Sequence, residues 1–105
     1  MIRFKENLYL TKKTVKKSDK IIKDIENGKF ISFVCLVTLS ANTDDVFDII
    51  PLFNLKIRSD IYDDIVVIGI AENNKAAIKM CAKLVEHYYM SDMSKSMREY
   101  FTDLD

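Results

Sequence analysis

Two segments of this chain are almost continuously apolar and rich in β-branched residues, and they constrain the fold more than any other feature. The first covers residues 30–39, with the sequence FISFVCLVTL, and the second covers residues 65–71, with the sequence IVVIGIA. A strand that is apolar on both sides must be covered on both faces, which is typical of a parallel sheet packed between helices. We therefore expect two buried strands here, running parallel.

Two helices are indicated by apolar residues that recur on one face. In residues 14–27 the apolar positions are Val15, Ile21, Ile22 and Ile25. This helix should end at Asn27-Gly28, because glycine accepts the left-handed conformation that closes a helix. A longer helix is expected over residues 75–90, with Asn73 or Asn74 as its cap. Its predicted core stripe is Ala77, Cys81, Leu84, Val85 and Tyr88.

The remaining elements complete the predicted fold. Residues 2–10 alternate weakly and indicate a short edge strand. Between the two apolar strands we expect a short helix that breaks at Pro51, and a last helical segment should follow Ser94. The order is β-α-β-α-β-α. It predicts a small three-layer α/β/α sandwich with about three mostly parallel strands, in one domain that spans residues 1–105.

Composition is ordinary for a globular protein, with 49% apolar and 30% charged residues. No apolar run approaches the roughly 18 residues that indicate a membrane span. The first ten residues include Arg3, Lys5 and Glu6, so they lack the apolar stretch of a signal peptide. We expect a cytoplasmic protein with no membrane partner.

Charge is distributed unevenly although the net charge is zero. Residues 1–29 hold nine Lys or Arg against four acidic residues, so they carry +5 and the remainder carries −5. Such polarity indicates a solvated helix face, or opposite poles that attract each other between subunits. The lysine-rich first helix lacks arginine and interleaved aromatic residues, which makes nucleic acid an unlikely partner.

Polar residues follow both apolar strands, where the carboxyl ends of parallel strands would meet. They are the candidates for ligand binding: Asn42, Thr43, Asp44, Asp45, Glu72, Asn73 and Asn74. Asp44, Asp45 and Glu72 could share a Mg²⁺ ion. The simpler interpretation is that the aspartates stabilise a helix N-terminus and that Glu72 faces solvent.

Catalytic chemistry finds little support in the sequence. Gly69 is one glycine where a dinucleotide-binding loop needs three, and Walker spacing is absent. His87 is the only histidine and falls on the flank of the long helix, while Cys35 and Cys81 lie in apolar segments as core thiols. We therefore predict no catalytic residue, no metal site and no cofactor, and whether the protein is an enzyme stays uncertain, leaning towards no.

Aromatic residues and methionines concentrate near the C-terminus, and residues 92–105 are expected to form a docking helical tail. The candidate interface residues are Tyr89, Met90, Met93, Met97, Tyr100 and Phe101. These residue types are enriched in protein interfaces, but they suit docking on the chain's own domain equally well. The resulting hypothesis is a non-catalytic interaction or regulatory module that forms a homo-oligomer or binds a protein partner. The alternative is a small-ligand- or Mg-dependent enzyme with its site at the carboxyl ends of the strands.

Overall fold

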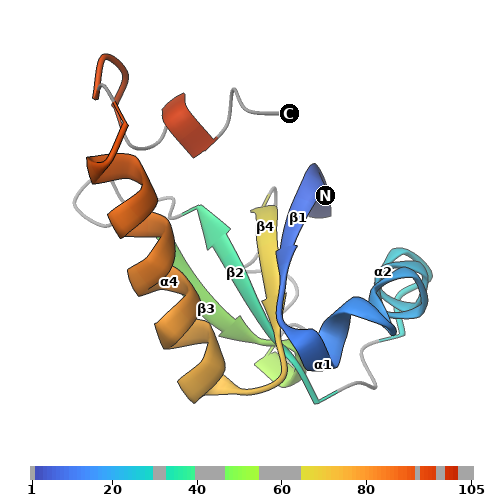
Figure 1. Cartoon of the computed structure of the whole chain (residues 1–105). Helices are drawn as coiled ribbons and strands as arrows, with labels where there is room; N and C mark the ends of the chain where they lie inside the picture. Colours follow the sequence, from blue (N-terminus) through green and yellow to red (C-terminus); the bar gives the residue numbers. More distant parts are fainter. Residues whose placement is uncertain are drawn as a thin grey trace.

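The computed structural model describes residues 2–29, 33–39, 47–54, 65–91, 93–96 and 99–101. The described strands are β1 (Ile2–Leu10), β2 (Cys35–Leu39), β3 (Phe47–Pro51) and β4 (Ile65–Ala71), and the helices are α1 (Lys12–Val15), α2 (Ser18–Glu26) and α4 (Asn74–Tyr89) (Figure 1). The predicted α/β class is confirmed. A helix long and apolar enough to cross a membrane does not occur in these ranges.

The strands form one mixed sheet in the order β1-β4-β2-β3. β1 pairs parallel with β4, whereas β2 pairs antiparallel with both β3 and β4. The prediction of about three mostly parallel strands is therefore wrong. A strand, β3, stands where a helix was expected, and the two apolar strands β2 and β4 run in opposite directions. Their apolar residues indicate that both faces of each strand are buried. Two antiparallel strands can be buried on both faces as well.

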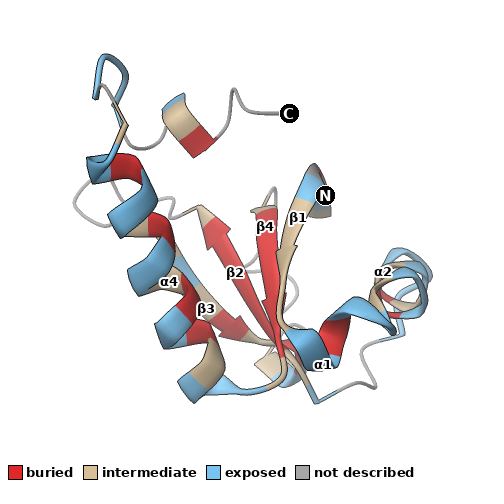
Figure 2. Cartoon of the chain, in the orientation of Figure 1, coloured by how far each residue is buried: buried red, intermediate tan, exposed pale blue. Residues whose placement is uncertain are grey.

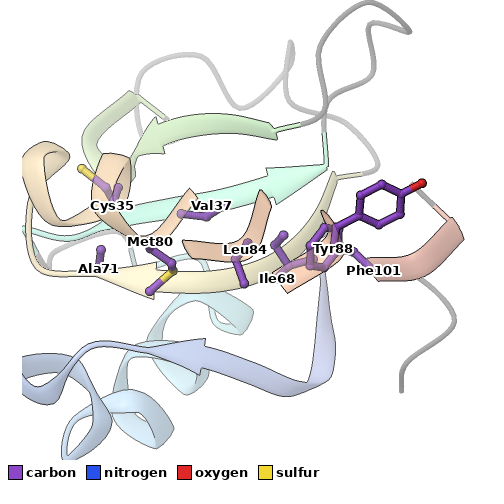
Figure 3. Packing of buried hydrophobic residues seen from close by; sticks show 9 residues of the cluster. Cys35, Val37, Ile68, Ala71, Met80, Leu84, Tyr88 and Phe101 are labelled. Atoms are coloured by element: carbon purple, nitrogen blue, oxygen red, sulfur yellow. The ribbon is translucent and has the colours of Figure 1, made fainter. Parts of the chain in front are cut away.

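Buried residues form two clusters, to which neighbouring residues of one strand contribute alternately. Val37 and Ile68 belong to the first cluster, which α4 covers (Figure 3). Leu36 and Val67 belong to the second, together with Ile21 and Ile25 of α2. This alternation follows from the pleat of a strand. Ile21 and Ile25 are the only buried residues of α2. The predicted arrangement of three layers, with helices covering both faces of the sheet, therefore stays a prediction.

The expected helix over residues 14–27 is divided into α1 and α2. Lys17 precedes α2 with φ −108° and ψ 1°, outside the helical region. Val15, predicted to face the core, is 52% exposed. The predicted end is confirmed, because α2 stops at Glu26 and Gly28 has φ 75°, the left-handed conformation.

Helix α4 begins as predicted, since the Asn73 side chain accepts a hydrogen bond from the Ala76 backbone N–H at 2.8 Å. Its buried residues lie along one side of the helix (Figure 2), and they differ in part from the predicted stripe. Met80 is buried, whereas Cys81 and Val85 are only half-buried. The reason lies on β4. Gly69 has no side chain, and a Cβ atom there would stand 2.5 Å from the Met80 sulfur, so the helix turns this residue towards the sheet.

The C-terminal segment docks on its own chain. Phe101 is fully buried, and its ring lies 5.1 Å from that of Phe47 and 6.5 Å from that of Tyr9, measured between centroids. The Tyr88 hydroxyl donates a hydrogen bond to the Lys95 carbonyl, which ties the segment to the end of α4. Phe101 therefore packs on its own chain, while docking of the whole tail over residues 92–105, within or between chains, stays a prediction.

Candidate functional site

A cavity of about 550 Å³ lies between α4 and the end of β1. One wall is formed by residues 9–13, and the other is one face of α4 from Ala76 to His87, where the lining residues recur every three or four positions. At a rise of about 1.5 Å per residue, this face runs for about 16 Å. The cavity volume falls within the range of about 300–1,000 Å³ that is common for small-molecule sites.

The order of the strands explains why the cavity forms here. Helix α4 packs over β4, β2 and β3, while β1 lies beyond β4 at the edge of the sheet. The helix therefore leaves part of β1 uncovered on this side. The floor of the resulting groove is apolar, with Met80 and Leu84 of α4 only 9% and 2% exposed and with Tyr9 half-buried against the same cluster.

Parallel pairing of β1 with β4 brings the residues that follow the two strands to one end of the cavity. Leu10 pairs with Ile70, so Thr11 and Glu72 come directly after neighbouring strands. The turn is held in place because the Thr14 hydroxyl donates to the Ile70 carbonyl at 3.0 Å and accepts from the Thr11 N–H at 3.0 Å. Ligands commonly bind at such carboxyl ends.

Positive charge predominates around the cavity. Lys12 and Lys13 lie at the start of α1, and Lys79 and Lys83 face the same space from α4. All four side chains are exposed at the rim of an apolar floor. A carboxylate or phosphate suits such lysines, and an apolar body suits the floor beneath them.

Glu72 is the one carboxylate among the residues described around the cavity. A hydrogen bond from the Thr11 side chain holds the pKa of Glu72 below its usual value, with smaller contributions from its own backbone N–H and the charge of Lys13. Its Oε2 atom is buried and has no hydrogen-bond partner among the described residues. At neutral pH the site therefore contains an ionised carboxylate.

The residues predicted to bind a ligand are only partly placed by the structure. Glu72 lines the cavity, while Asn73 caps α4 and Asn74 is its first residue. Asn42, Thr43, Asp44 and Asp45 lie outside the described residues. The reason for grouping them with Glu72 is wrong, because β2 and β4 are antiparallel, so their carboxyl ends lie at opposite ends of the sheet.

Sequence reasoning missed Tyr9, Lys12 and Lys13 as parts of the site. Tyr9 lies near the end of β1, and Lys12 and Lys13 follow that strand. These positions indicate a site only once β1 is known to lie beside β4. The two lysines had instead been interpreted as the solvated side of the first helix.

The other chemically interesting side chains do not form a second centre. No three His, Cys, Asp or Glu side chains of the described segments are grouped closely enough to hold a metal ion. Cys35 is buried, as predicted, whereas Cys81 is only half-buried, and burial raises the pKa of both thiols. His87 is exposed and lines the end of the cavity near the last turn of α4.

The candidate interface residues divide into two groups. Tyr89, Met90 and Met93 are 59%, 80% and 47% exposed. Tyr100 is half-buried and Phe101 fully buried in their own chain, while Met97 lies outside the described residues. An exposed apolar surface therefore remains at the end of α4, but Phe101 belongs to the core.

Comparison of this chain with known protein families, with curated proteins and with solved structures gives no match.

Proposed function

We propose that this protein binds a small anionic ligand with an apolar body in the cavity between α4 and β1. The observation that carries the proposal is the convergence of lysines from two separate elements on one apolar floor. Lys12 and Lys13 come from α1, and Lys79 and Lys83 from α4. A lysine ammonium acts as a point charge for carboxylate or phosphate groups, and several around one cavity raise the local concentration of anions.

The test is titration with octanoate, with 1-octanol as the neutral ligand of matched length. We expect octanoate to bind and to shift the amide resonances of α4 and residues 9–13, and we expect added salt to weaken the affinity. The double variant Lys79→Gln/Lys83→Gln should lose about five- to thirtyfold in affinity, if each charge contributes about 0.5–1 kcal/mol.

The matched control is Lys20→Gln/Lys23→Gln on α2, since neither residue lines the cavity. It removes the same amount of charge from the protein and should leave the octanoate affinity unchanged. Equal losses in the two double variants, or equal binding of octanoate and 1-octanol, would contradict the proposed function.

We further propose self-association through the surface of Tyr89, Met90 and Met93, whose exposure is the observation that favours it. Light scattering of the full-length protein should give the mass of a dimer, and Tyr89→Ser/Met90→Ser should give that of a monomer. This variant leaves Phe101 in place, which a truncation after Met90 would not. A wild-type monomer at every concentration would rule the interface out.

A further inference from the structure

We propose that the anionic group of the ligand is a dianion, and that the ligand class is a phosphate monoester with an apolar body. Lysines of both cavity walls, on α1 and on α4, share its phosphate group. This inference rests on the proposed function, because it specifies the head group that the same cavity selects.

The first argument is the charge of the cavity. Four lysines line its walls: Lys12, Lys13, Lys79 and Lys83. Glu72 is the one acidic residue described around it, so the net charge of the lining side chains is +3 with His87 neutral. A monoanionic ligand would leave +2 here, whereas a dianion leaves +1. Because Coulomb attraction grows in proportion to the charge of the ligand, the site favours the dianion.

The second argument is that neither helix balances its own lysines on this side. Lys79 has Lys75 and Lys83 four residues before and after it in α4, and no acidic residue lies three or four positions away from it. In the other wall, residues 12–17 contain four lysines and no acid. Like charges one turn apart on a helix repel each other. A bound anion of high charge relieves this repulsion on both walls.

The third argument is the number of oxygen atoms that two walls of lysines can use. Lys12 and Lys13 line the cavity from α1. Lys79 and Lys83 line it from α4, one helical turn apart. A carboxylate has two oxygens in one plane, while a phosphate monoester has three terminal oxygens that point in different directions. One phosphate group can therefore accept hydrogen bonds from lysines of both walls.

The experiment compares octyl phosphate with octyl sulfate, which has the same chain and a tetrahedral head group but one charge less at pH 8. At that pH, octyl phosphate should bind the wild-type protein about tenfold more tightly, the gain expected when one more ligand charge meets several exposed lysines. At pH 5 the phosphate keeps one proton, because its second pKa is about 6. Both ligands are then monoanions, and their affinities should become nearly equal whatever the charge of His87.

The variant Lys12→Gln/Lys13→Gln tests whether the wall on α1 contributes to this preference. It should weaken the binding of octyl phosphate more than that of octyl sulfate, and so reduce the preference at pH 8. The control Lys20→Gln/Lys23→Gln on α2 removes the same amount of charge outside the cavity and should keep the preference. All four lysines are exposed, so both variants should fold.

The same phosphate chemistry occurs on small soluble molecules and on membrane lipids, and two further probes separate the sources. Inorganic phosphate lacks the apolar body and should bind more weakly than octyl phosphate. Vesicles of phosphatidylcholine with one fifth phosphatidic acid should not sediment the protein. Binding to these vesicles without binding of monomeric octyl phosphate would overturn the inference, as would inorganic phosphate that binds as tightly as its octyl ester.

The outcomes for the inference and for the proposed function can be told apart. Equal binding of octyl phosphate and octyl sulfate to the wild type at pH 8 would overturn the dianion and leave the proposed function intact. Equal losses of the preference in the two double variants would also overturn it, because net charge and not the cavity would then decide. No binding of these ligands or of octanoate would remove both.

Discussion

Replacing Phe101 with alanine is expected to lower the free energy of unfolding by about 3–5 kcal/mol, the usual cost of deleting a buried aromatic side chain. Phe101 is fully buried, and its ring centroid lies 5.1 Å from that of Phe47 and 5.0 Å from that of Tyr100. The substitution removes these edge-to-face contacts and leaves a cavity at the end of the sheet. Urea unfolding at equilibrium measures the change.

The matched control is Met90→Ala in the same part of the chain. Met90 is 80% exposed, so its substitution should change the stability by no more than about 0.5 kcal/mol. Similar small effects of the two substitutions would mean that the tail does not dock as described. A loss for Phe101→Ala that disappears on dilution would instead indicate that Phe101 is buried in a second copy of the chain.

The sequence could not decide where the tail docks, because the same residue types suit a core and an interface. The missing information was the strand at residues 47–51, which supplies the Phe47 ring against Phe101. That strand was missed because Asp44, Asp45 and Pro51 are typical of the first turns of a helix. In the structure Phe47 and Ile49 pack against the first buried cluster while Ile50 belongs to the second, the alternation expected of a strand.

Strand existence was easier to predict than strand direction. The apolar runs of β2 and β4 predicted burial on both faces correctly, and Leu36, Val37, Val67 and Ile68 are fully buried. The relative direction of β2 and β4 depends on how the chain connects them. A helical crossover and a connection that includes β3 need similar lengths of chain. Nothing in the apolar pattern distinguishes them.

The candidate site was likewise predicted only in part. The rule that ligands gather at the carboxyl ends of parallel strands correctly singled out Glu72 as a residue at such an end. The strand whose carboxyl end lies beside that of β4 is β1, because β1 is parallel to β4 and β2 is antiparallel to it. The residues that join Glu72 are therefore Thr11, Lys12 and Lys13.

Adding a methyl group at Gly69 is expected to cost about 1–3 kcal/mol of stability, the usual range for overpacking a core. A Cβ atom at this position would stand 2.5 Å from the Met80 sulfur and 3.0 Å from the Tyr9 carbonyl oxygen. The pairing of β4 is irregular on both sides here, with register shifts against β1 and β2. Glycine in a strand often marks such a close approach of backbone.

A double-mutant cycle separates the two contacts. Gly69→Ala should cost less in a Met80→Ala background, because the sulfur is then gone and only the Tyr9 carbonyl remains close. Gly28→Ala is the comparison. No atom lies within 4 Å of a Cβ there, and φ is 75°, so its cost of about 1 kcal/mol comes from the backbone conformation and should not depend on Met80.

The same substitution connects the core to the cavity. Met80 and Tyr9 both line the cavity, so a methyl group at Gly69 can be accommodated only by moving one of its walls. We therefore expect Gly69→Ala to weaken octanoate binding in protein that is still folded, and Gly28→Ala to leave it unchanged. Unchanged binding by folded Gly69→Ala would show that the wall formed by Met80 does not touch the ligand, and would place the apolar body nearer Leu84.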